Sequence, residues 1–134
     1  MLGCNLILDT DILVALLKGK RDANEAMQGL QEKGDEAATT IVSAYELLKG
    51  AYLSSRPKDN LAEVQELLSN MHVLDLTQQA CEEASVIYRD LRKTGSLIGE
   101  FDVLIAAIVR TYDETIMTRD EHFTFIRGTK VTEW

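Results

Sequence analysis

Short segments rich in apolar or β-branched residues alternate with longer helical patterns along this whole sequence. The predicted strands cover residues 5–8, 37–42, 72–76 and 115–118, with a possible edge strand at 131–134. The predicted helices cover residues 12–17, 22–33, 43–53, 59–70, 77–93 and 101–112, and a helical turn follows at 123–126. Strands that alternate with helices favour a parallel sheet covered on both faces. We therefore expect a three-layer α/β/α fold with a mainly parallel sheet of four or five strands.

The length of 134 residues is typical of one domain, and no repeat or low-complexity stretch marks a boundary within it. We therefore predict a single domain over residues 1–134. No apolar run approaches the roughly 20 residues of a membrane span, and the first nine residues lack the pattern of a signal peptide. Cys4 and Cys81 form no CxxC pair, so we expect two buried thiols in a protein of the reducing cytoplasm, with a disulfide between them as the alternative.

The charge balance limits the kinds of partner that the chain can bind. A formal net charge of −8 argues against a simple cationic nucleic-acid binder, which would normally be basic. An acidic chain can still handle phosphates if part of its negative charge holds metal cations. A polyanion would then be held by local basic groups and by the cations themselves.

Four acidic residues lie where predicted strands end or predicted helices begin. Asp9 ends the first strand, and Asp120 follows the fourth. Glu46 lies in the first turn of the helix after the second strand, and Asp102 begins the apolar helix before the fourth strand. In an open parallel sheet, ligands bind at the edge formed by the carboxyl ends of the strands and the helix N-termini that follow them. The four carboxylates are therefore predicted to converge.

Some of these acids also have a purely structural explanation. Asp9 fits a turn or a helix N-cap, and Asp120 fits a further cap. Glu46 completes the pattern S-x-x-E with Ser43, a capping box in which the glutamate reaches back to the backbone N–H of the serine. The pattern leaves both the structural and the functional interpretation of these three acids open.

Asp102 is harder to explain as a cap alone. An acid is favourable near a helix N-terminus, but residues 103–109 are apolar enough to be buried all round, so a charge at this point needs a partner. Packing several carboxylates together without a cation costs several kcal/mol or forces protonation. Mg²⁺ and Mn²⁺ prefer carboxylate oxygens and can activate a water for attack on a phosphodiester. No histidine is needed: His72 is expected to be structural, and His122 is not counted among the site residues.

The segments around the four acids resemble the successive motifs of PIN-domain ribonucleases. These segments are L-D-T-D-I-L at 8–13, Y-E-L at 45–47, I-G-E-F-D-V-L-I-A-A at 98–107 and T-R-D-E-H-F at 118–123. The D-T-D opening is a weak signal by itself, whereas D-x-L-I-A-A followed by T-x-D-x-x-F is fairly specific. Within the family, the chain most resembles the VapC-type toxins of prokaryotic toxin–antitoxin pairs, over essentially its whole length.

The resemblance implies a set of site residues and an activity. The four metal-coordinating carboxylates would be Asp9, Glu46, Asp102 and Asp120. Thr118 would lie beside them as a hydroxyl near the metal or substrate, and Thr10 and Asp11 would support the metal ligands. The implied activity is cleavage of RNA by a metal-activated water, dependent on Mg²⁺ or Mn²⁺. The resemblance also implies a homodimer and a cognate antitoxin that covers the active-site groove.

Several basic residues lie near these motifs in the sequence and are candidates for contacts to RNA phosphates. The candidates are Lys18, Lys20, Arg21, Lys49, Arg56 and Arg119. A solvated surface position explains each of them equally well.

Two other functions compete with the nuclease interpretation. A D-x-D after the first strand also occurs in haloacid-dehalogenase-type phosphatases, and the sequence from Asp9 to Asp11 fits that fragment. Those enzymes give the motif around Asp102 no role, and their other motifs are not evident here. A non-catalytic PIN-like binding module, in which the acids only cap helices, is the second alternative.

Overall fold

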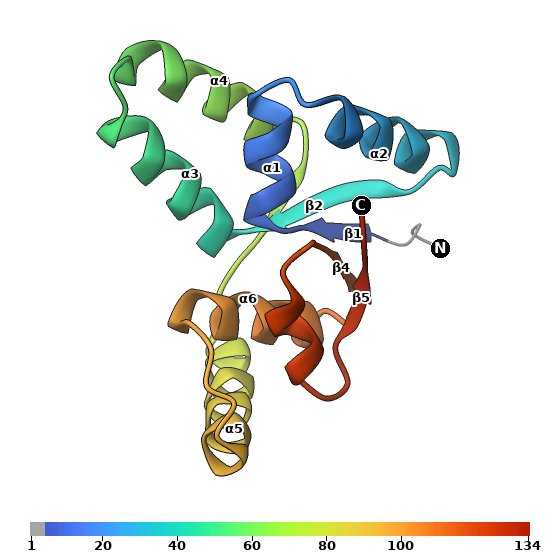
Figure 1. The fold of residues 1–134 in the computed structure, drawn as a ribbon, viewed down its shortest axis with the longest axis vertical. Helices are drawn as coiled ribbons and strands as arrows, with labels where there is room; N and C mark the ends of the chain where they lie inside the picture. The colour runs from blue at the N-terminus through green and yellow to red at the C-terminus, as the bar shows by residue number, and fades with distance from the viewer. Residues whose placement is uncertain (1–4) are drawn as a thin grey trace.

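The computed structural model describes residues 5–134, which form a five-stranded sheet with helices on both faces (Figure 1). The strands are β1 (Asn5–Leu8), β2 (Glu36–Thr40), β3 (His72–Leu74), β4 (Thr115–Met117) and β5 (Lys130–Thr132). The helices are α1 (Thr10–Leu17), α2 (Arg21–Glu32), α3 (Ile41–Leu53), α4 (Pro57–Ser69), α5 (Gln78–Thr94) and α6 (Glu100–Thr111), with a 3₁₀ helix η1 (Glu121–Phe125). Helices α1 to α4 lie on one side of β1 and β2, and α5 and α6 lie on the other (Figure 1).

The strand order is β3-β2-β1-β4-β5, and all four pairings of neighbouring strands within residues 5–134 are parallel. The predicted three-layer α/β/α fold is confirmed, and the edge strand at the end of the chain is β5. The chain builds the sheet outward from β1 in one direction through β2 and β3, and in the other through β4 and β5. The direction changes between β1 and β4, and such a switch point is where ligands bind in open α/β sheets.

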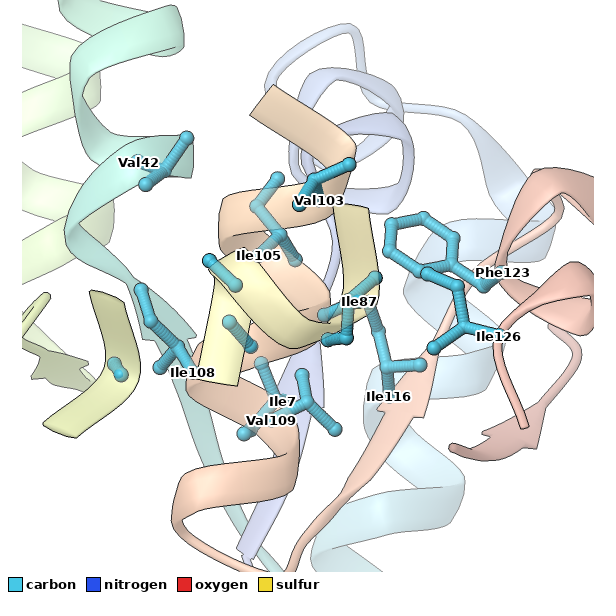
Figure 2. Packing of buried hydrophobic residues seen from close by; sticks show 14 of the residues in the cluster. Ile7, Val42, Ile87, Val103, Ile105, Ile108, Val109, Ile116, Phe123 and Ile126 are labelled. Atoms are coloured by element: carbon cyan, nitrogen blue, oxygen red, sulfur yellow. The ribbon is translucent and has the colours of Figure 1, made fainter. Parts of the chain in front are cut away.

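Alternate residues of the central strand enter two separate hydrophobic cores. Ile7 packs with its register partners Ala38 and Ile116 into the core against α5 and α6. Leu8 points the other way, into the core formed with α1 to α4. Figure 2 shows Ile7 beside Val109 of α6, and Ile116 near Ile87 of α5 and Phe123 of η1. A strand that is buried on both faces explains the continuous apolar run at the start of the sequence.

The ends of α5 follow the predicted capping residues. Thr77 is the N-cap, and its hydroxyl accepts a hydrogen bond from the backbone N–H of Ala80 at 3.1 Å. Gly95 is the C-cap, with a φ of 69°. This left-handed backbone favours glycine because a Cβ atom would be strained there.

The boundary between β2 and α3 differs from the prediction. Ile41 and Val42 were expected to extend the strand, but the helix already begins at Ile41. Thr40 is the N-cap, and its hydroxyl accepts from the N–H of Ser43 at 3.1 Å. The capping hydrogen bond outweighs the β propensity of the two branched residues. Glu46 consequently lies in the second turn of α3, so its predicted placement in the first turn is wrong.

Two further expectations bear on the surface of the molecule. Cys81 is exposed, so the prediction that it is buried is wrong; Cys4 lies outside the described residues. Within residues 5–134, no helix is both long enough and apolar enough to cross a membrane.

Truncation of Ile116, which is fully buried in the core between the sheet and α6, tests this packing. We expect Ile116→Ala to lower the free energy of unfolding by about 2–5 kcal/mol, because the change leaves a cavity. The same substitution at Ile41, which is 41% exposed, is the matched control and should cost less than about 1 kcal/mol. Urea unfolding followed by circular dichroism measures both, and equal losses would contradict the assignment of the core.

Candidate metal-binding site at the carboxyl edge of the sheet

The carboxyl ends of β1 and β4 and the first turns of α1 and η1 meet at one edge of the sheet. Asp9 directly follows β1, and Asp120 is the N-cap of η1 after β4. Glu46 reaches this edge from α3 and Asp102 from the first turn of α6. The charge of Asp102 acts on Asp9, and those of Asp120 and Glu46 act on Asp102. The structure therefore brings together the four acids that the sequence singles out.

Asp9 is the most buried of these acids, with 5% of its surface exposed. One carboxylate oxygen accepts from the N–H of Thr10 at 2.8 Å, and the other accepts from the hydroxyl of Thr118 at 2.7 Å. Burial raises the pKa of Asp9 to about 7, and the charges of Asp11 and Asp102 add to the increase, while the two hydrogen bonds oppose it. Asp9 caps α1, as its structural explanation requires. In addition, burial destabilises its ionised form.

Asp102 lies partly buried in the first turn of α6. Burial, and after it the neighbouring charges of Asp120 and Glu46, raise its pKa to about 6, while the charge of His122 opposes them. A favourable helix terminus therefore does not compensate for the surrounding negative charge. The sequence indicated that the charge of Asp102 needs a partner. Within residues 5–134, no Lys or Arg pairs with it.

Glu46 faces the other acids rather than its own helix. Its Oε1 accepts from the hydroxyl of Thr10 at 2.8 Å. The hydroxyl of Thr10 also lies 2.9 Å from that of Ser43. The N–H of Ser43 donates to Thr40, so the capping box with Ser43, the alternative explanation of Glu46, is not formed. The capping of α3 thus gives no reason for a glutamate at position 46.

His122 belongs to this edge as well, although it was not counted among the predicted site residues. Its Nδ1 lies 2.8 Å from Oδ1 of Asp120, which also accepts from the backbone N–H of His122 at 2.9 Å. Ligand atoms of Asp102, Asp120 and His122 all lie within 4.8 Å of one another. Asp9 and Glu46 lie outside this tight group and connect to it through Asp102. The spacing of Asp120 and His122, two residues apart before a helical turn, was the available signal for the histidine.

Thr118 connects the two sides of the site. It is 2% exposed, donates to Asp9, and accepts from the backbone N–H of Asp120 at 2.9 Å. Asp11 accepts from the backbone N–H of Arg119 at 2.8 Å and from the indole N–H of Trp134 at 3.4 Å. Two of the three predicted supporting residues, Thr118 and Asp11, therefore fix the loop after β4 against the start of α1.

The six basic residues that are candidates for RNA contacts lie in different environments. Lys18 lines a groove of about 310 Å³ that also contains Thr10 and Glu46. Arg21 is exposed and pairs with Glu25 at 3.6 Å. Lys49 lies over the rings of Tyr45 and Phe101.

Arg119 is held by other groups of the chain. It pairs with Asp22 at 2.8 Å, donates to the backbone oxygen of Trp134 at 2.6 Å, and stacks on the indole ring at 3.5 Å. The hydrogen bond from Arg119 lowers the pKa of Asp22. Of the remaining two candidates, Arg56 pairs with Asp59 at 2.6 Å. Lys20 is exposed at the start of α2.

The donor chemistry of this edge fits a hard divalent cation. Its ligands are carboxylate oxygens with one imidazole nearby, a set that suits Mg²⁺ or Mn²⁺. Burial and the charges of neighbouring acids raise the pKa values of Asp9 and Asp102, and a bound cation would compensate these negative charges. A hollow of about 710 Å³ lies elsewhere, between α5 and the segment after η1, and none of the four carboxylates lines it.

Comparison with known proteins finds the PIN-domain family, which the sequence motifs resemble, over most of the chain. The PIN domain profile matches residues 6–128. Ribonuclease VapC2 of Haemophilus influenzae is 30% identical over 105 residues, which cover 78% of each protein. The tRNA(fMet)-specific endonuclease VapC of Shigella flexneri is 28% identical over 129 residues, or 96% of each protein.

The fold agrees with these sequence matches. The crystal structure of DNA-bound VapBC from Salmonella typhimurium contains a chain that superposes with a TM-score of 0.88. The two chains are 26% identical, and the match covers 100% of this chain and 99% of that one. The profile match and the 30% identical relative together show that this chain belongs to the PIN-domain family, and within it to the VapC proteins.

Proposed function

We propose that this protein is a metal-dependent endoribonuclease and the toxin of a toxin–antitoxin pair. The observation that carries the proposal is the convergence of Asp9, Glu46, Asp102 and Asp120 at the switch point of the sheet, with the pKa values of Asp9 and Asp102 raised. RNA as the substrate class follows the activities named for the Haemophilus and Shigella relatives. Against a non-catalytic module, the hydrogen bonds of Glu46 and the charges around Asp102 are not those of simple helix caps.

The four carboxylates would hold Mg²⁺ or Mn²⁺ in this reaction. A bound divalent cation supplies charge neutralisation at the phosphodiester and favours the ionised form of an attacking water. The chain itself places the carboxylate oxygens on both sides of the switch point between β1 and β4. His122 donates its backbone N–H to Asp120, and its Nδ1 lies 2.8 Å from the same oxygen, so it fixes the direction of that carboxylate.

Thr118, Thr10 and Asp11 position the ligands rather than react. Thr118 orients Asp9 and restrains the backbone of Asp120, while Thr10 orients Glu46. Asp11 holds the backbone of Arg119. These hydrogen bonds keep the carboxylates in place before a cation binds, which lowers the cost of forming the site.

The substrate and the protein partners would approach from the same edge. We assign Lys18, Arg21 and Lys49 to phosphate contacts, with Arg119 contributing only after exchange of its contacts to Asp22 and Trp134. The groove of about 310 Å³ beside Thr10 and Glu46 is mostly apolar, and we propose that an antitoxin segment covers it. We also propose that the protein forms a homodimer, as the family resemblance implies.

Removal of a carboxylate tests the activity. We expect Asp102→Asn to lower the rate of RNA cleavage at least about 100-fold, because a cation contributes several kcal/mol to the transition state and loses a ligand. Asp113→Asn, a change of the same kind on an exposed acid, is the control. Cleavage of labelled RNA with Mn²⁺, with and without EDTA, measures the effect.

The outcomes separate the alternatives. Full activity of Asp102→Asn would contradict the site, and cleavage that continues in EDTA would contradict the metal. Hydrolysis of p-nitrophenyl phosphate through Asp9 would instead identify a phosphatase.

Thr118→Val tests the positioning role of this buried hydroxyl. The variant removes the donor to Asp9 and the acceptor for the N–H of Asp120, and we expect a loss of about 1–3 kcal/mol in unfolding free energy. Affinity for Mn²⁺ should fall too, whereas Thr118→Ser should restore both. Metal affinity equal to that of the unchanged protein in Thr118→Val would refute the role.

The stability of the metal-free protein should decrease as pH rises from about 4 to about 7. The pKa of Asp9 is 3.8 when exposed and about 7 in the fold, so in this window the folded state binds more protons than the unfolded state. Ionisation therefore costs folding free energy as pH rises. Thermal melting from pH 4 to 8 measures the trend, and Asp9→Asn should flatten it.

Mn²⁺ should reverse this loss at neutral pH by binding the folded state. At 100 times its dissociation constant, a ligand adds about 2.7 kcal/mol, or several degrees in Tm. A melting temperature that does not change across a manganese titration would exclude the site.

A further inference from the structure

Two aromatic rings and one lysine lie together on the surface beside the carboxylates. Tyr45 directly precedes Glu46 in α3, and Phe101 directly precedes Asp102 in α6. The two ring centroids are 5.6 Å apart, and the ring planes are 87° apart, an edge-to-face pair. The ammonium of Lys49 lies 5.2 Å from each centroid.

These three side chains are not part of either hydrophobic core. Tyr45 is 52% exposed and Phe101 is 37% exposed, and Lys49 is exposed as well. Within residues 5–134, Lys49 forms no ion pair, although the chain is acidic overall. The group therefore offers aromatic surface and an uncompensated cation next to the carboxylate cluster.

Exposed aromatic rings beside a cation match the chemistry of single-stranded RNA. An unpaired base can stack on a ring, because every base has an aromatic face, while a cation contacts the adjacent phosphate. A paired base cannot reach such a ring without leaving its stack. Tyr45 and Phe101 fit the base, and Lys49 is a point charge that fits the phosphate.

We propose that Tyr45, Phe101 and Lys49 form a stacking subsite for an unpaired nucleobase of the RNA, next to the bond that is cleaved. The proposal rests on the ribonuclease function proposed above, and it adds a requirement for an unpaired base at a fixed position from the cleaved phosphate. Tyr45 and Phe101 are each one residue from a site carboxylate, which places the subsite close to the reacting phosphate.

Binding of a fluorescein-labelled, unstructured RNA oligonucleotide tests the subsite directly. The Asp102→Asn protein is the background, so that the RNA stays intact, and fluorescence anisotropy gives the dissociation constant. We expect Tyr45→Leu to weaken binding about tenfold, as for the loss of one stacked base, and Tyr45→Trp to retain it. Tyr52→Leu is the matched control, because Tyr52 is an exposed tyrosine of the same helix, two turns further along.

Oligonucleotides with a single abasic nucleotide locate the base. One position should exist at which loss of the base weakens binding to the Tyr45 protein about tenfold and leaves binding to Tyr45→Leu unchanged. Lys49→Met should weaken binding in a way that depends on salt, whereas Lys58→Met, on α4, should not.

Cleavage kinetics with otherwise unchanged protein complete the test. Tyr45→Leu should raise KM about tenfold and change kcat less than about twofold, because stacking contributes equally to substrate and transition-state binding. Equal RNA affinity of Tyr45→Leu and the unchanged protein would overturn the subsite, as would an abasic series with no sensitive position. If Tyr45→Leu instead breaks a dimer in sedimentation velocity without changing RNA affinity, the rings form an interface between copies and the subsite is wrong.

The subsite and the ribonuclease activity can fail separately. RNA binding that depends on Tyr45, together with no cleavage by the unchanged protein, would refute the enzyme and support the subsite. Cleavage that is independent of Tyr45 would do the reverse.

Discussion

Asp9 loses almost all of its contact with water at a point where other carboxylates surround it, and the rest of the site follows from this cost. Burial of an ionised group costs several kcal/mol unless it is paired or hydrogen-bonded. Thr10 and Thr118 donate to its two oxygens, yet the pKa of Asp9 is still raised to about 7. Within residues 5–134, no Lys or Arg pairs with Asp9 or Asp102. A divalent cation is the simplest compensation for this uncompensated charge.

The topology of the sheet gives the carboxylates their common location. Because β1 is the central strand, and the chain extends the sheet from it in both directions, the loops after β1 and β4 lie side by side. Thr118, which follows β4, can therefore bond to Asp9, which follows β1. The apolar α6 packs beneath this edge and brings Asp102 to it. The two hydrophobic cores thus hold the acids together against their mutual repulsion.

The fold class and most elements could be predicted because periodicity, caps and glycines act locally. Thr77 and Gly95 delimit α5 as expected, and the apolar run before Asp9 is the central strand. The start of α3 could not be predicted, because Thr40 and Ser43 are both good caps and only the fold selects Thr40. Contacts between segments far apart in the sequence could not be predicted either, because the pattern of residues reports only local structure. The indole of Trp134 near Asp11 is one example, and the edge-to-face pair of Tyr45 and Phe101 is another.

The central claim is that the carboxylates are held together in order to bind a metal, and calorimetry tests it most directly. Mn²⁺ is titrated into the protein at about pH 6.5, in buffers that differ in ionisation enthalpy, so that binding and proton release are both obtained. We predict saturable binding that releases protons, because Asp9, with a pKa of about 7, is partly protonated before the metal binds. Absence of binding would contradict the claim. Affinity for Mn²⁺ that is unchanged when Asp9→Asn and Asp102→Asn are combined would contradict it too.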